Sequence, residues 1–385
     1  MKKIFESLQF LRIGTRVAAL SVILAGYAGH ASFAYELYDP AEVVELKRGI
    51  YFVFTGDLEK SQNIFLKYIK KHPERPEGYF LMACRYAEYM NAYRDRTDMA
   101  KFKMYAKMTI KKSNELIRAH PDDPTGYFFI GNLKGYTGMF DGQDQNWVQA
   151  FMDAVAVKKN LEKALELDPT LYDCYFALGT IYYYASKKQA DDGGLVGYII
   201  RKFITNNGDM RSAGIRMIEK AVTHGNLAID SAKSALLWVN MSEENYEVSE
   251  RLASELGQKY PRDRRYFWAK ARIGLAKNNC ASAMENFNEI TKLNEEEGLG
   301  LMRLPEVQNG QGVATMCLNL NVWKCNEAFQ VVKDLQYQVS HEETVWLEYP
   351  NANKVINEWT GLLYDYEKAI KQKREKSESY ADGCV

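Results

Sequence analysis

The chain of 385 residues lacks the features of several common classes of protein. Apolar and polar residues do not alternate in the runs that form strands, and there are only 9 prolines. Lys plus Arg and Asp plus Glu balance at 50 each, so no excess of positive charge favours a nucleic acid as partner. After residue 28 no apolar run is long enough to span a membrane. These absences leave a helical globular protein as the expectation.

Patterns of known catalytic and metal sites are also missing. The sequence has no C-x-x-C pair, no H-E-x-x-H, no phosphate-binding loop and no G-x-S-x-G. Two of its 5 histidines, His72 and His120, stand directly before a proline, where the polarity of a helix end favours a cation. The stretch "DGQDQN" over 141–146 lacks the terminal Glu of a calcium loop. We therefore expect no enzyme activity, no metal and no cofactor.

The N-terminus has the composition of a secretory signal peptide. Four basic residues accompany an apolar run over 17–28, and "HASFA" places small residues up to Ala34. Because twelve apolar residues are too few to cross a bilayer, we expect cleavage after Ala34 rather than an uncleaved anchor. Removal of residues 1–34 takes away four basic residues and one acidic residue, which leaves 46 Lys plus Arg against 49 Asp plus Glu. The expected location is the periplasm of a Gram-negative bacterium.

One pattern recurs at fixed distance along the chain. The stretches "PERPEGYFLMA" (73–83), "PDDPTGYFFIG" (121–131) and "PTLYDCYFALG" (169–179) follow one another at intervals of 48 residues. In each, an aromatic residue, an aliphatic residue and a small residue fall in a stripe along one side of a helix, as Tyr127, Ile130 and Gly131 do. A small residue in such a stripe lets a neighbouring helix approach closely. The repeated unit is therefore predicted to be an antiparallel pair of helices.

These spacings resemble those of the tetratricopeptide repeat (TPR) family. The first unit carries Gly49, Phe52, Phe65, Tyr68 and Pro73 at the family's positions. The resemblance implies an all-α, right-handed α-solenoid. The expected hairpins cover 42–73, 76–121, 124–169, 172–225, 230–261, 264–293 and 307–340.

The expected organisation is a signal peptide over 1–34, a solenoid over 35–345 and a capping helix and tail over 346–385. Solenoids need such caps because an end repeat otherwise exposes its stacking face. The interval of 48 exceeds the family's period by fourteen residues. Shared between two helices, that excess lengthens each by roughly 10 Å. We therefore expect the middle hairpins to project as a ridge or to carry longer loops.

The resemblance also implies that the first helices of the hairpins line a concave groove that binds a peptide segment or a helix of another protein. The residues expected there are Glu77, Phe80, Phe128, Asn132, Tyr136, Phe176, Thr180, Tyr183, Tyr184, Trp238, Trp268 and Arg272, with Cys84 and Glu88 on the same stripe. The groove lacks the repeated Lys and Arg with which family members bind a carboxylate. We expect a protein–protein interaction scaffold of an envelope assembly or transport complex.

Several alternatives stay open at this point. The aromatic side chains expected in the groove could instead belong to the hydrophobic core, or the same groove could hold a small molecule or a lipid. The apolar run over 195–204 could contact a membrane surface or pack on the fourth hairpin as an inserted helix. A disulfide could form among Cys280, Cys317 and Cys325 in an oxidising compartment.

Overall fold

The computed structural model describes residues 40–93, 96–144, 146–192, 194–206 and 208–298, with pieces of one or two residues between 310 and 375. This part of the chain forms the helices α3 to α15 and contains no strand, so the predicted all-α class is confirmed. The expected signal peptide over 1–34, seventh hairpin over 307–340 and cap over 346–385 lie wholly or largely outside the described residues.

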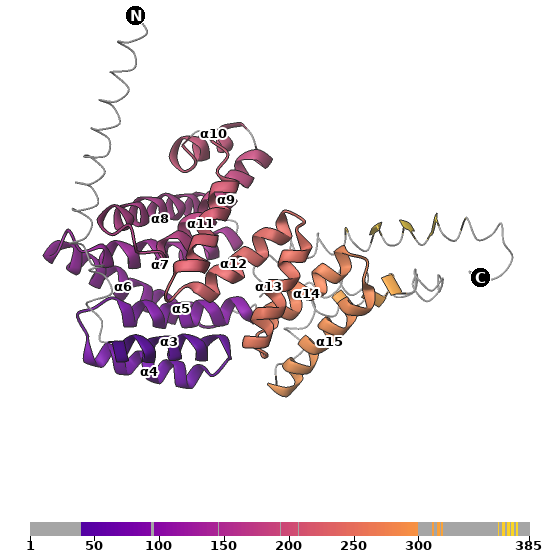
Figure 1. Cartoon of the computed structure of the whole chain (residues 1–385), viewed down its shortest axis with the longest axis horizontal. Coiled ribbons are helices and arrows are strands. Elements are labelled where there is room, and N and C mark those ends of the chain that lie inside the picture. The colour runs from indigo at the N-terminus through magenta and orange to yellow at the C-terminus, as the bar shows by residue number, and fades with distance from the viewer. Residues whose placement is uncertain are drawn as a thin grey trace, which may run out of the picture.

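Six hairpins follow one another along the described chain, within a few residues of their predicted bounds (Figure 1). They are α3 (Pro40–Phe54) with α4 (Leu58–Lys71), α5 (Glu77–Ala92) with α6 (Met99–Ala119), α7 (Pro124–Gln143) with α8 (Trp147–Leu167), α9 (Cys174–Asp192) with α11 (Arg211–His224), α12 (Ile229–Ser242) with α13 (Tyr246–Lys259), and α14 (Arg264–Ala276) with α15 (Cys280–Glu296). The further helix α10 (Gly194–Phe203) lies between the two helices of the fourth hairpin.

Polar side chains begin and end several of these helices. The Asp57 carboxylate accepts a hydrogen bond from the backbone N–H of Lys60 (3.3 Å), and Asp123 accepts one from Thr125 (2.8 Å). Each satisfies a backbone donor that the first turn of a helix leaves without a partner. The C-terminal caps of α4 and α6 are His72 and His120.

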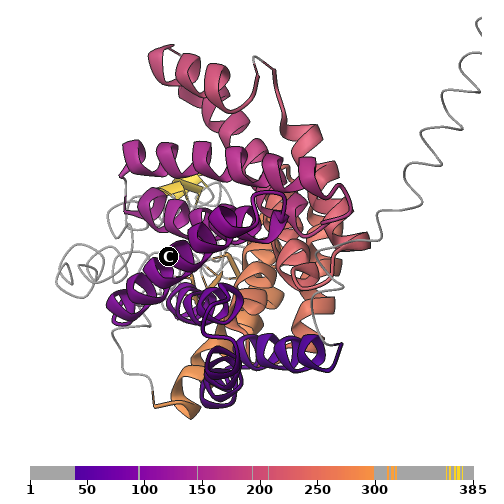
Figure 2. The same ribbon diagram turned by 90° about the vertical axis from the view of Figure 1, so that its left-hand side faces the viewer.

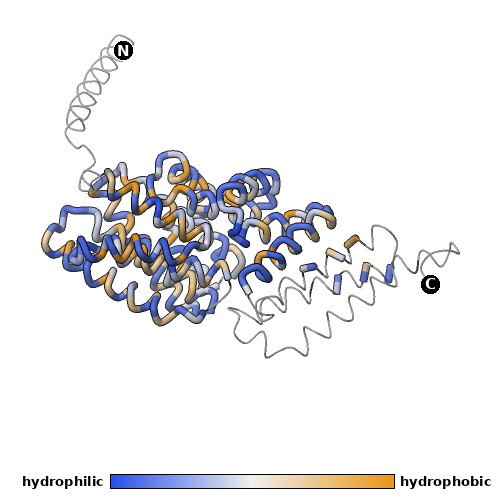
Figure 3. Tube along the Cα trace, turned by 90° about the horizontal axis from the view of Figure 1, so that it is seen from below, coloured by the Kyte–Doolittle hydropathy of each residue, from blue (hydrophilic) through white to orange (hydrophobic). Residues whose placement is uncertain are grey.

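The first helices of the hairpins form an inner layer. Neighbours in this layer contact one another: α3 with α5, α5 with α7, α7 with α9, and α9 with α12. The second helices cover the outside, and each contacts its own partner and the first helix of the next hairpin. Most helices carry both hydrophobic and hydrophilic positions along their length (orange and blue in Figure 3), as helices with one buried face require. The fold is an α-solenoid.

The small residues of the repeated stripe lie where helices approach most closely. A Cβ added at Gly131 would lie 2.5 Å from Cδ2 of Leu161, and one at Gly179 would lie 2.6 Å from the backbone oxygen of Gly214. The corresponding residue of the second hairpin, Ala83, is fully buried. The predicted reason for the pattern, close helix packing, is confirmed.

The solenoid closes on itself, which the repeat pattern did not predict. Residues of the first two hairpins contact residues of the fifth and sixth, about 200 positions later in the chain. The Tyr93 hydroxyl donates to Glu297 Oε2 at 2.9 Å, and the Arg265 guanidinium forms an ion pair with Glu88. The Phe54 ring lies 5.0 Å from that of Tyr260, measured between centroids. We refer to these contacts as the seam.

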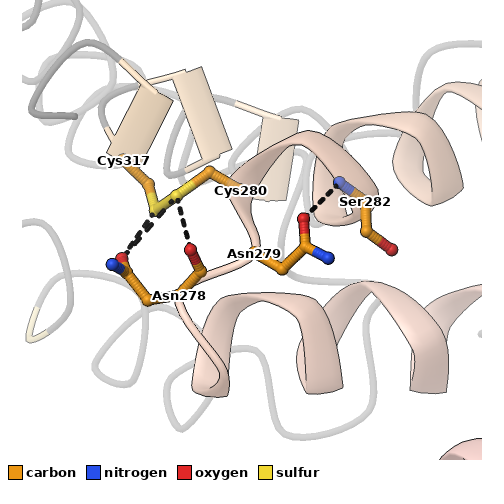
Figure 4. Close-up of a disulfide and its surroundings, with 5 residues drawn as sticks. All are labelled: Asn278, Asn279, Cys280, Ser282 and Cys317. Atoms are coloured by element: carbon orange, nitrogen blue, oxygen red, sulfur yellow. Dashed lines mark hydrogen bonds between the residues drawn. A yellow bond between two sulfur atoms is a disulfide. The ribbon is translucent and has the colours of Figure 1, made fainter. Parts of the chain in front are cut away.

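The structure shows one disulfide and one inserted helix among the possibilities that the sequence left open. Cys280 is bonded to Cys317, with Cα atoms 5.6 Å apart (Figure 4). The segment over 195–204 contains an inserted helix: α10 contacts α9, and Ile200 of α10 and Ile204 directly after it are buried in the core that the third and fourth hairpins share. Seen from two sides, α10 projects beyond the other helices at the top (Figure 1, Figure 2).

Candidate binding groove

Two adjoining cavities lie on the inner layer. The larger, here called the groove, has a volume of about 1070 Å³ and is bordered by residues of α5, α7, α8, α9, α10, α12, α14 and α15. The smaller, here called the inner pocket, has about 90 Å³ and lies between α3, α5, α7 and the start of α12. Asn132, Tyr136 and Phe176 border both cavities. The inner layer therefore encloses one continuous concave surface.

Most of the residues expected in the groove border one of these cavities. Glu77, Phe80 and Phe128 line the inner pocket, whereas Thr180, Tyr184, Trp238, Trp268 and Arg272 line the groove. The prediction for Tyr183 is wrong. Its ring is fully buried in the core between the fourth and fifth hairpins, and its hydroxyl donates to Glu243 at 2.6 Å. The packing of α9 against α12 turns this ring away from the groove.

The rings of the inner pocket pack against one another. The Phe80 ring lies 5.1 Å from Phe129 and 6.4 Å from Tyr136, and Phe128 lies 5.0 Å from Phe129. Glu77 is 2% exposed and forms an ion pair with Arg75 at 2.9 Å. A volume of 90 Å³ has room for little more than water. Here the alternative that the rings belong to the core describes the structure well.

The groove differs from the inner pocket in exposure. Tyr184 on α9 is 44% exposed, and Trp238 on α12 is half-buried. Trp268 on α14 is nearly buried, with its ring edge-on to Phe287 at 5.5 Å. Fixed aromatic rings with an accessible face are the side chains on which binding energy concentrates in protein interfaces. The groove, rather than the inner pocket, therefore offers accessible aromatic rings.

The seam supplies the charged wall of the groove. Arg265 forms ion pairs with Glu88 and, at 2.6 Å, with Asp263. Burial alone would lower the pKa of this guanidinium, but the two carboxylates outweigh it and hold the pKa well above its usual value. Arg264 forms an ion pair with Glu297 at 2.8 Å, and its guanidinium carbon lies 4.5 Å from the Tyr93 ring centroid. Both arginines are thus used to hold hairpins together.

The hydroxyl of Tyr136 and the thiol of Cys84, near the junction of the two cavities, are weaker acids than usual. Burial, reinforced by Cys84 and Glu88, raises the pKa of Tyr136 well above its usual value, and its hydroxyl donates to Glu88 at 2.7 Å. Burial also raises the pKa of the Cys84 thiol.

The part of the chain that the structure describes holds no group of three or more His, Cys, Asp or Glu that could ligate a metal ion. Over those residues, no helix has the length and apolar character needed to span a bilayer.

No protein-family model matches the chain, and no curated protein sequence is significantly similar to it. Two solved structures show a distant similarity to the chain. One is the APC/C hetero-tetramer Cut9-Hcn1, at 11% identity and a TM-score of 0.46, covering 83% of this chain and 53% of that chain. The other is a tetratricopeptide repeat protein from Parabacteroides merdae, at 14% identity and a TM-score of 0.35, covering 85% of this chain and 100% of that chain.

The chain thus spans about half the length of the Cut9-Hcn1 chain that it matches. These likenesses concern the fold alone. The order of helix contacts, with each first helix beside the second helix of the preceding hairpin, describes a tetratricopeptide-like α-solenoid.

Sequence reasoning missed several residues of the groove. Trp147 and Phe151 of α8 border it, as do Arg264 and Arg265 of α14. Lys188 borders it too, and its ammonium lies 4.8 Å from the centroid of the Trp147 ring. Trp147 belongs to a second helix, which the family pattern places on the outside. The signal that could have found it is the long period, which carries the start of α8 beyond the neighbouring repeats.

Proposed function

We propose that this protein is a scaffold that binds a segment of a partner polypeptide in the groove. The observation that carries the proposal is the groove itself: about 1070 Å³ bordered by aromatic rings of five helices, α7, α8, α9, α12 and α14. Tyr184, Trp238 and Trp268 come from three successive hairpins, so an extended segment or a helix of the partner could contact all three rings. The seam fixes the distance between the walls, which reduces the entropy lost when the partner binds.

The partner is proposed to be a protein of the cell envelope, within an assembly or transport complex of the periplasm. The support for this location is the predicted signal peptide over 1–34. Determining the N-terminus of the protein purified from the envelope tests it. An N-terminus at Tyr35 is expected, and an N-terminus at Met1 would contradict the proposed cleavage.

Capture of a partner by groove variants tests the binding site. Tyr184→Ala and Trp238→Ala, alone and together, are expected to remove the captured polypeptide from envelope extracts. Tyr51→Ala is a matched control, because that ring is 43% exposed against 44% for Tyr184 but borders neither cavity. Thermal melting of each variant shows whether it is folded. Equal capture by wild type and by a folded double variant would contradict the proposal. Phe128 is left unchanged because it packs in the inner pocket.

A second candidate function is supported by the size of the groove. Pockets for small ligands usually have about 300–1,000 Å³, and the groove is close to the upper end of this range. A small molecule or lipid carried by a transport accessory protein would fit a concave, largely apolar surface of this volume. Native mass spectrometry of the purified protein distinguishes the two candidates. A retained small molecule favours the accessory protein, and a retained polypeptide favours the scaffold.

A further inference from the structure

One exposed apolar surface lies beside the mouth of the groove. It combines the start of α8 with the outer side of α10 and is here called the rim patch. Its apolar members are between 50% and 73% exposed: Trp147, Val148, Met152, Tyr198 and Phe203. The two helices meet through Phe151 and Phe203, whose ring centroids are 6.2 Å apart. Large apolar side chains that are exposed on two neighbouring helices are candidates for a contact site.

The rim patch also carries positive charge. Arg201 and Lys202 are exposed in the last turn of α10, and the Lys202 ammonium lies 5.7 Å from the Phe203 ring centroid. Arg201 and Lys202 lie three and four residues after Tyr198, so they share its side of the helix. The opposite side of α10 is packed: Ile200 is 7% exposed and Ile204, directly after the helix, is 2% exposed. The helix is therefore held in the protein while its outer side remains free.

Two acidic side chains in the adjoining loops do not cancel this charge. Asp144, before α8, forms an ion pair with Arg96 at 3.0 Å. Asp209, after α10, forms one with Arg211 at 2.6 Å. Arg201 and Lys202 are thus the charged side chains that α10 itself presents.

We propose that the rim patch binds the surface of an anionic lipid membrane. Aromatic and aliphatic side chains beside Arg and Lys suit the boundary between headgroups and acyl chains, where the rings enter and the cations meet lipid phosphate. The position of α10 agrees with this, because it projects beyond the other helices and can reach a flat surface before they do (Figure 1, Figure 2). A lipid surface, unlike a concave partner, requires no matching shape.

Membrane binding at this place has a consequence for the groove. Trp147 and Val148 belong to the rim patch and also border the groove, as does Ile199 on the inner flank of α10. Docking of the rim patch therefore brings the mouth of the groove to the lipid surface. This proposal does not depend on what the groove holds.

Flotation with lipid vesicles tests the proposal. The protein is purified after export and its N-terminus is checked by mass spectrometry, so that all variants share the same start. Wild type is expected to float with vesicles of phosphatidylcholine and phosphatidylglycerol, and less with phosphatidylcholine alone. The partition coefficient should fall about tenfold in Tyr198→Asp with Phe203→Asp. It should fall roughly 20-fold in Arg201→Glu with Lys202→Glu, since each cation contributes on the order of fivefold.

A matched control places the same change on another surface. Val44 on α3 and Met104 on α6 are 63% and 52% exposed, so Val44→Asp with Met104→Asp alters equally accessible apolar residues outside the rim patch. This variant should float like wild type. The proposal is overturned if wild type stays in the soluble fraction with both kinds of vesicle, or if the control loses as much binding as the rim variants. Far-UV circular dichroism and melting confirm that each variant is folded.

Discussion

The second and third hairpins are built from longer helices than the fifth and sixth. In the former pair the helices have 16, 21, 20 and 21 residues, and in the latter 14, 14, 13 and 17. In the third hairpin the extra residues lie in the helices rather than in the loop, since α7 ends at Gln143 and α8 begins at Trp147, whereas the loop between α5 and α6 covers 93–98. The four long helices exceed the four short ones by five residues on average, which corresponds to roughly 7.5 Å of added helix.

The two regions form different walls of the groove. The added turns of the long hairpins carry Gly138, Gly142 and Trp147 along one side of it. The short hairpins supply α14, whose Arg265 closes the seam against Glu88 of α5. The long hairpins thus supply one wall of the groove, and the seam fixes the wall that α14 supplies. The added turns also extend the core, because Phe102 of α6 and Phe140 of α7 are buried there with ring centroids 5.1 Å apart.

Alanine at two glycines should separate the open second half of α7 from the closely packed α14 most strongly. A Cβ at Gly274 of α14 would lie 2.9 Å from the backbone nitrogen of Ala283, so Gly274→Ala is expected to lower the free energy of unfolding by up to about 3 kcal/mol. A Cβ at Gly135 of α7 finds its nearest neighbour at 3.9 Å, the Cβ of Ala177. Gly135→Ala should leave stability unchanged or raise it by about 0.5–1 kcal/mol. Urea denaturation measures both, and equal losses would contradict the difference in packing.

A smaller effect is expected where the two regions meet. Glu88→Gln leaves the Arg265 guanidinium, whose side chain is only 13% exposed, with Asp263 as its remaining carboxylate. The free energy of unfolding should fall by about 2 kcal/mol. The distribution of distances between spin labels on α5 and α14 should broaden in the same variant. Glu250→Gln, which breaks an exposed pair with Lys277, is the control and should cost under about 0.5 kcal/mol. An unchanged spin-label distance in Glu88→Gln would show that apolar contacts alone hold the seam.

How far the sequence predicts the structure differs between these regions. The hairpin bounds and the roles of Gly131 and Gly179 followed from the repeat, because helix period and close packing act over short distances. The seam could not be predicted, since Tyr93 and Glu297 are 204 positions apart and neither belongs to a pattern. Tyr183 was misplaced for a related reason. In a run of three tyrosines, the rotation of α9 against α12 decides which ring is buried.

The smallest expected effect is the pH dependence of the seam. Burial would raise the pKa of Glu297, but Arg264, with Tyr93 and Arg262, outweighs it and lowers the pKa below its ordinary value of 4.5. A carboxylate with a lowered folded pKa contributes stability that is full above 4.5 and is lost as the pH falls through the folded value. Glu297→Gln should remove this part of the acid dependence, by under about 1 kcal/mol because the group is partly exposed. Superimposable stability–pH curves for variant and wild type would contradict this.

Photo-crosslinking tests binding in the groove most directly. Benzoylphenylalanine at position 184 points from α9 into the groove, and at position 51 it occupies an equally exposed site that borders neither cavity. Illumination of cells should crosslink a polypeptide at 184 and none at 51, and Trp238→Ala should abolish the product. The absence of a crosslinked polypeptide at 184, or the same product at both positions, would contradict a scaffold that binds its partner in the groove.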